Sequence, residues 1–187
     1  MLKNLFFILS FFYLSVGLAQ DVEQQTDSLL NVIAHTRYDS IKVEAYIELA
    51  QLNLYTQPHK TVEYCEKHIN LCESIGDYTF PTQAYTLIFN AQYYYGAPAD
   101  SLLLTIQRYE NHVKSYLSDE YLLNVYWIYG LYYNNLSQSD KAIEGYIKAL
   151  EIAQEYKYGG EVKGALVSNI GGILLDQGEL EEARDYF

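Results

Sequence analysis

The set of side chains best suited to chemistry is Cys65, His68 and Cys72, which are spaced three and four residues apart. On a helix this spacing places them on one face, where thiolate and imidazole groups could bind zinc. The same positions also fit an apolar stripe, so we favour packing between helices, with His68 hydrogen-bonded locally. A disulfide is excluded because seven helical residues separate the two Cα atoms by about 10 Å. The sequence predicts no metal site and no cofactor.

No other group of residues resembles a catalytic set. The nucleophile-elbow serine motif, the glycine-rich phosphate loops, H-E-x-x-H and C-x-x-C are all missing from the sequence. Glu179, Glu181 and Glu182 cluster at the start of an expected helix, where negative charge favours the positive end of the helix dipole. We therefore expect a protein without enzymatic activity.

The composition limits the classes of partner. The chain has 187 residues, with 24 acidic and 12 basic side chains and a net charge of −12, and half of its residues are hydrophobic. This hydrophobic share supports a folded domain rather than a disordered chain. The negative charge repels the phosphate backbone, so we expect no nucleic-acid partner. A protein or peptide partner is the remaining expectation.

The first 19 residues have the pattern of a secretory signal peptide. Lys3 precedes an apolar run over residues 5–18, and Gly17-Leu18-Ala19 matches the small-residue pattern of a cleavage site. A membrane span needs about 20 apolar residues, so this run favours a cleaved signal over an uncleaved anchor. We expect an exported protein, periplasmic or extracytoplasmic, in which residues 20–187 do not themselves contact a membrane.

The remaining sequence has the periodicity of amphipathic helices. Between Leu122 and Tyr133 the apolar residues recur at intervals of three and four, which places them on one helical face. Strand-like alternation is absent at any useful length. The sequence predicts an all-α protein with helices over residues 21–36, 39–56, 58–75, 80–95, 100–117, 119–135, 139–157 and 161–177, and from 179 onward.

These helices form a repeat of about 40 residues. Small residues recur at Ala50, Ala91, Gly130 and Gly171, at intervals of 41, 39 and 41 residues. Each is followed by a second helical stripe, and a small side chain lets the two helices of such a hairpin cross closely. A single hairpin cannot bury its apolar face alone and must stack on its neighbours.

The repeat resembles the tetratricopeptide repeat family. In the third unit, Tyr126, Tyr129-Gly130 and Tyr133 occupy the family's Trp, Leu-Gly and Tyr positions, and the second-helix positions are filled by Ala142, Tyr146 and Ala149. The fourth unit offers Gly171, Ala183 and Phe187. No unit ends in the family's Pro, and every unit is longer than the usual 34 residues.

The resemblance implies a right-handed α-solenoid. A lead-in helix would occupy residues 20–38, and repeats would occupy about 39–78, 79–118, 119–160 and 161–187. Phe187 falls at the main packing position of the last helix, so we expect the chain to be a piece of a longer protein.

The resemblance also implies a concave groove lined by the first helix of each repeat. By position, the partner-binding residues would be Gln51, Tyr55, Tyr85, Gln92, Tyr95, Asn124, Trp127 and Asn134. This groove lacks Lys and Arg, so its amides would bind the backbone of an extended peptide. Trp127 would be an anchor, or alternatively a partly shielded surface aromatic. The 21 tyrosines would serve recognition or replace Phe and Leu in the helix seams.

Two functions remain open from the sequence. The first is a non-catalytic, exported interaction module that binds a protein or peptide in the groove. The second is the extracytoplasmic sensor region of a truncated bacterial receptor, whose output would be a histidine kinase or a DNA-binding domain.

Overall fold

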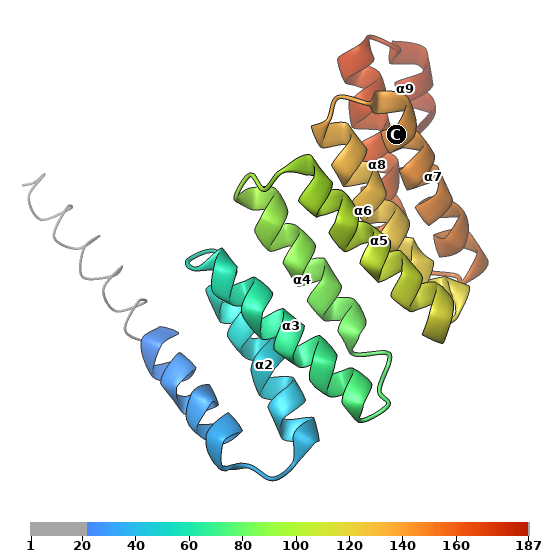
Figure 1. Ribbon diagram of the computed structural model, residues 1–187. Coiled ribbons are helices and arrows are strands. Elements are labelled where there is room, and N and C mark those ends of the chain that lie inside the picture. The colour runs from blue at the N-terminus through green and yellow to red at the C-terminus, as the bar shows by residue number, and fades with distance from the viewer. Residues whose placement is uncertain (1–21, 187) are drawn as a thin grey trace, which may run out of the picture.

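The computed structural model describes residues 22–186, and within them every regular element is a helix (Figure 1). Residues 22–35 form the first helix, followed by α2 (Asp39–Asn53), α3 (Pro58–Ser74), α4 (Pro81–Tyr94), α5 (Ala99–Tyr116), a 3-10 turn (Asp119–Tyr121), α6 (Leu122–Asn135), α7 (Ser139–Glu155), α8 (Gly160–Gln177) and α9 (Leu180–Tyr186). The all-helical prediction is confirmed, and most helix ends lie within three residues of the expected ones. The predicted signal peptide and Phe187 lie outside the described residues.

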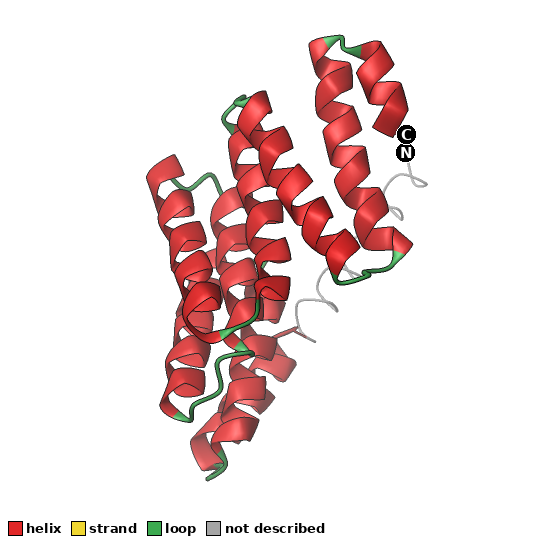
Figure 2. Cartoon of the chain, turned by 90° about the vertical axis from the view of Figure 1, so that its right-hand side faces the viewer, coloured by secondary structure: helices red, strands yellow, loops and turns green. Residues whose placement is uncertain are grey.

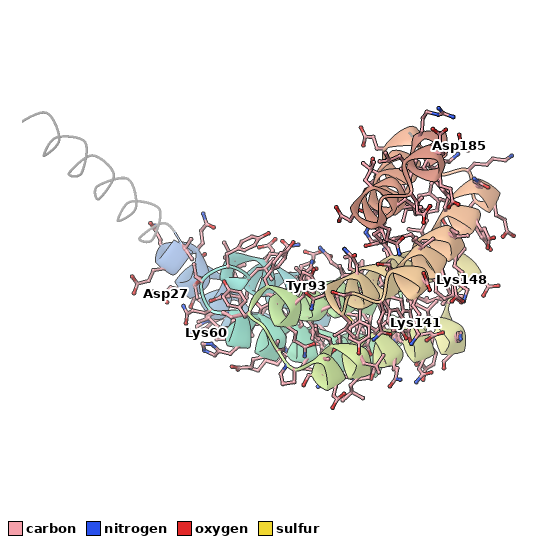
Figure 3. All side chains as sticks on the ribbon, turned by 90° about the horizontal axis from the view of Figure 1, so that it is seen from above. Asp27, Lys60, Tyr93, Lys141, Lys148 and Asp185 are labelled. Atoms are coloured by element: carbon pink, nitrogen blue, oxygen red, sulfur yellow. The ribbon has the colours of Figure 1, made fainter. Side chains whose placement is uncertain are left out.

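The helices form antiparallel hairpins that stack in chain order, α2 with α3, α4 with α5, α6 with α7 and α8 with α9 (Figures 1 and 2). The first helices of successive hairpins are neighbours, since α2 contacts α4 and α4 contacts α6. The second helices bridge the repeats, because α3 also contacts α4 and α5 also contacts α6. Seen from above, the row curves and the C-terminal hairpin turns out of its line (Figure 3). This architecture is an α-solenoid.

Helix ends follow local sequence signals. Pro58 and Pro81 begin α3 and α4, where the missing N–H costs nothing. Gly178 ends α8 with φ +83°, in the left-handed region that glycine adopts without strain. These signals fix the hairpin boundaries and therefore which faces of the helices meet.

The core is a layer between the helices that runs through the stack as two clusters. One cluster extends from α2 to α6 and includes Leu49, Phe89 and Ile106, and the other joins α6, α7, α8 and α9 through Ala149, Leu166 and related side chains. Among the residues expected to pack between repeats, the structure buries Ala50, Ala91, Gly130, Ala142, Tyr146, Ala149, Gly171 and Ala183 and leaves Tyr126 and Tyr133 half-buried.

Helices α6 and α7 cross in close contact at two glycines, Gly130 and Gly145. A Cβ atom added at Gly130 would lie 2.5 Å from Cε1 of the Tyr146 ring, and one added at Gly145 would lie 2.8 Å from the Gly130 backbone nitrogen. Gly145 was not identified in the sequence analysis, because it lies on the second helix, where the family pattern specifies no glycine. The two glycines together let the helix backbones touch.

None of the helices within residues 22–186 is both long and apolar enough to cross a bilayer.

Candidate interaction surface

The first helices of the second and third repeats contain no charged residue. Neither α4 nor α6 has an Asp, Glu, Lys or Arg. Because the second helices cover one side of these first helices, their exposed side chains lie on the opposite side. We call this surface the inner face and define it by the exposed or half-buried residues Glu44, Glu48, Gln51, Gln83, Leu87, Asn90, Asn124, Trp127, Leu131 and Asn134.

Most of the described cations lie on the second helices instead. Lys67 on α3 pairs with Glu63, Lys114 on α5 with Glu110, and Lys148 on α7 with Glu144, each at 2.6 Å. Figure 3 labels Lys60, Lys141 and Lys148 among the side chains of these helices. Positive charge is thus concentrated on the side opposite the inner face, and the part of the inner face formed by α4 and α6 is neutral.

Four of the predicted groove residues lie on the inner face. The side chains of Gln51, Asn124 and Asn134 are exposed. Trp127 is half-buried and packs against the cluster formed by α7 and α8. Its ring is therefore held in place while part of it remains accessible.

Tyr55 and Tyr95 lie at the edge of the stack, where the hairpins turn. Tyr55 is 73% exposed and Tyr95 is 49% exposed. The Tyr95 hydroxyl donates a hydrogen bond to the Tyr55 backbone carbonyl, which ties the two turns together. Tyr94 adds a third exposed ring, whose centroid lies 6.4 Å from that of Tyr55.

Tyr85 does not line the groove, and this prediction is wrong. The side chain is 4% exposed and its ring stacks on Tyr109 of α5, with centroids 5.3 Å apart and an interplanar angle of 12°. Gln92 is half-buried, and its side-chain oxygen accepts a hydrogen bond from Thr105 of α5 at 2.8 Å. Each residue turns a helix by 100°, so a small error in the repeat register moves a side chain to another face.

Gln83, Leu87 and Asn90 are the inner-face residues of α4, and the sequence analysis identified none of them. Gln83 is exposed and the other two are half-buried, and the three continue the line formed by Gln51 on α2 and Asn124 on α6. The signal that could have found them is the uncharged, amide-containing stretch of α4 itself, which does not depend on the register of the repeat.

Cys65, His68 and Cys72 are buried within the first repeat. His68 Nδ1 lies 2.9 Å from the Val43 carbonyl and Nε2 lies 3.3 Å from the Phe80 carbonyl. Burial raises the pKa of each thiol to about 12, with further contributions from nearby carboxylates. The three residues therefore act in packing, and no cluster of three His, Cys, Asp or Glu side chains in residues 22–186 is arranged to hold a metal.

The second helices enclose a separate pocket of about 410 Å³ over α6. Its walls include Tyr126 and Tyr133, and Lys148 and Lys141 lie over these two rings at 5.6 and 5.2 Å from the centroids. The cations are therefore already engaged by the protein's own aromatic rings. Two further hollows, of about 520 and 690 Å³, flank the helix of residues 22–35, and the smaller one includes Gln51.

Comparison with known proteins supports the fold but not a sequence family. No protein-family model matches the chain, and no curated protein matches it. The structure is similar to that of a Rap protein complexed with competence and sporulation factor, with a TM-score of 0.74, 12% identity, and coverage of 93% of this chain and 48% of Rap. The chain thus spans about half the length of that protein.

Two further solved structures are similar. A putative kinesin light chain from Podosopora anserina with nearly identical TPR-like repeats gives a TM-score of 0.65 at 14% identity, over 90% of this chain and 83% of that one. A signal-transduction ATPase from Pyrococcus horikoshii with a tetratricopeptide repeat sensor gives 0.67 at 19% identity, over 84% of this chain and 24% of that one. The fold is therefore the tetratricopeptide-like α-solenoid that the sequence predicted.

Proposed function

We propose that the chain is a non-catalytic interaction module that binds an extended peptide or protein segment on its inner face. The observation that carries the proposal is the neutral surface of α4 and α6, which exposes amides beside apolar side chains in a chain of net charge −12. The similar Rap protein was solved in complex with competence and sporulation factor, which supports a bound partner for this type of fold.

The chemistry of the inner face suits a neutral, extended segment. The amide groups of Gln51, Asn90 and Asn134 both donate and accept hydrogen bonds, so they can pair with peptide N–H and C=O groups. Leu131 and Trp127 add apolar area between the amides, and Trp is enriched among residues that dominate binding energy. The absence of Lys and Arg from α4 and α6 argues against a clamp for carboxylates.

The test is a selection of binders from a displayed library of random uncharged peptides, followed by Kd measurements on the purified mature chain. Trp127→Ala should raise the Kd of the selected peptides by about tenfold or more, as expected for an aromatic residue that dominates binding energy. Tyr38→Ala is the matched control, because Tyr38 is 70% exposed and lies outside the inner face. It should leave Kd unchanged.

Circular dichroism of each variant separates loss of binding from loss of fold. Because Trp127 also packs on the α7–α8 cluster, Asn134→Ala provides a second variant at an exposed position. Equal Kd values for wild type, Trp127→Ala and Asn134→Ala would refute binding on the inner face.

We also propose that the protein is exported. The support is the apolar run over residues 5–18 followed by Gly17-Leu18-Ala19. Expression of the complete chain in a bacterial host, followed by mass spectrometry of the periplasmic fraction, should give a product that begins at Gln20. An unprocessed product retained in the cytoplasm would contradict the proposal.

The second candidate is the sensor region of a larger signalling protein. It is supported by the similarity to the ATPase whose tetratricopeptide repeats are described as a sensor. Sequencing the coding DNA beyond codon 187 tests it. A downstream span of about 20 apolar residues followed by a kinase or helix-turn-helix pattern would favour a sensor, and a stop codon without such a span would favour the free module.

A further inference from the structure

The larger hollow beside the helix of residues 22–35 has the size of a small-molecule site. Its volume is about 690 Å³, within the range of about 300–1,000 Å³ that is typical of ligand pockets. One wall is the N-terminal half of this helix, and the other is the turn between α2 and α3 together with the start of α3. None of the lining residues belongs to the inner face, so the hollow is separate from the peptide site proposed above.

Asn53, the last residue of α2, gives the hollow a buried polar group. The residue is 2% exposed, and its side-chain amide donates a hydrogen bond to the Leu49 carbonyl at 2.8 Å. Its side-chain oxygen accepts no hydrogen bond from any other described residue. Because Asn53 lines the hollow, this oxygen is available to a donor on a bound molecule.

The hollow also has unpaired charges of both signs. Glu23 and Asp27 line it from the helix of residues 22–35, and Lys60 lines it from α3 (Figure 3 labels Asp27 and Lys60). None of the three forms an ion pair with another described residue. A ligand can therefore meet a carboxylate on one wall and an ammonium group on the other without breaking an existing pair.

The helix ends at the hollow reinforce this separation of charge. No basic residue lies in the last turn of α2, no acidic residue lies in the first turn of α3, and no side chain caps the start of α3. The carbonyl end of a helix attracts a positive group and the N–H end attracts a negative one. The turn between α2 and α3 thus favours one ligand group of each sign, and Lys60 in the first turn of α3 adds to the positive end.

Apolar side chains make up the rest of the lining that the argument needs. Tyr64 is 7% exposed and forms part of the hollow, and Leu30 on the opposite wall is 40% exposed. An apolar group between them would remove apolar surface from water, which is favourable.

We propose that the hollow binds a free apolar α-amino acid in its zwitterionic form. The ammonium group donates hydrogen bonds to the Asn53 side-chain oxygen and to the Asp27 carboxylate. The carboxylate pairs with Lys60 at the start of α3, and the apolar side chain packs between Leu30 and Tyr64. An amine without a carboxylate would leave Lys60 unpaired, and an acid without an ammonium group would place a negative charge beside Asp27.

The test is an NMR titration of the mature chain with leucine and with two analogues that each lack one charged group. Isoamylamine lacks the carboxylate, and isocaproic acid lacks the ammonium group. Leucine should bind, and the Kd of each analogue should be at least about tenfold higher, as expected for the loss of a hydrogen bond between charged groups. No shift with leucine up to about 10 mM would overturn the proposal, as would an analogue that binds as tightly as leucine.

Asp27→Asn and Lys60→Gln test the two ends of the ligand separately. Each should raise the Kd of leucine by about tenfold, because each removes one charge that faces the ligand. Asp185→Asn and Lys141→Gln are the matched controls, since they make the same changes at exposed positions outside the hollow (Figure 3), and they should leave Kd unchanged. Equal leucine Kd values for wild type and both hollow variants would refute the site.

Hydrogen exchange gives an independent readout of where the ligand lies. A ligand in the hollow contacts both walls, so saturating leucine should slow amide exchange in the helix of residues 22–35 and leave α8 unchanged. Unchanged exchange in the helix of residues 22–35 would show that leucine does not bind in the hollow.

Discussion

Gly145 sets the distance between α6 and α7, and its replacement by alanine is the most informative single change in the core. The added Cβ would lie 2.8 Å from the Gly130 nitrogen, a backbone atom that cannot move without shifting α6. We expect Gly145→Ala to lower the free energy of unfolding by about 1–3 kcal/mol, the usual cost of overpacking. Urea unfolding followed by circular dichroism measures the change.

Gly172→Ala provides the matched control on α8, because nothing lies within 4 Å of the added Cβ. Alanine is a better helix former than glycine, so the free energy of unfolding of this variant should rise by up to about 1 kcal/mol. Similar effects for the two variants would contradict the close approach of α6 and α7.

Glu110 on α5 makes stability depend on pH in the acid range. Burial raises the pKa of Glu110, but hydrogen bonds from Lys114 at 2.6 Å and Tyr129 at 2.8 Å outweigh it and hold the pKa below its ordinary value of 4.5. Folding therefore favours the ionised carboxylate. Its stabilisation is complete well above pH 4.5 and is lost as the pH falls through the lowered pKa of the folded state.

We expect the stability difference between wild type and Glu110→Gln to be constant near pH 7 and to shrink below about pH 4.5, where the wild-type carboxylate becomes protonated. Urea titrations at a series of pH values measure it. Glu151→Gln on α7, an exposed position, is the control and should follow the wild type. If the stability difference between wild type and Glu110→Gln grew as the pH fell, folding would raise the pKa of Glu110 instead of lowering it, and the prediction would be wrong.

At the scale of the helices, the sequence predicts where each one lies better than which way it faces. The intervals of three and four apolar residues located the helices because burial requires an apolar face wherever the hairpins stack. Which face of α4 is buried was less predictable, because this depends on how α4 is rotated about its axis against α5. Tyr85 fits a groove position by repeat spacing, but its stacking on Tyr109 places it in the core. Gly145 and Asn90 were missed because their roles depend on the neighbouring helix.

The helix of residues 22–35 should be the least stable described helix of comparable length. None of its residues is fully buried, and Leu29 and Ile33 are its described contacts with the apolar core. Two hollows lined by this helix and by the α2–α3 hairpin reduce the contact between them. Local stability follows buried contact, so its amides should exchange hydrogen at least tenfold faster than those of α6. Hydrogen exchange with mass spectrometry tests this, and equal protection would contradict it.

At the scale of the whole molecule, charge is kept away from the part of the proposed binding surface that α4 and α6 form. Ion pairs such as Arg108–Glu66 at 2.6 Å lie on the second helices, while α4 and α6 carry no charge. Salt screens attractions between exposed charges, with a Debye length of about 10 Å at 0.1 M and 3 Å at 1 M. Binding through amides and apolar side chains contains no such attraction to screen.

A neutral peptide bound on the inner face should therefore keep its Kd within about twofold between 50 and 500 mM NaCl. Isothermal titration calorimetry at three salt concentrations measures this. A ligand held by the lysines of the second helices would weaken steeply over the same range, because Lys141 and Lys148 are exposed and accessible to counter-ions. A strong dependence of Kd on salt would thus indicate that the peptide binds on the opposite side of the solenoid. A Kd that does not change with salt would support binding on the inner face.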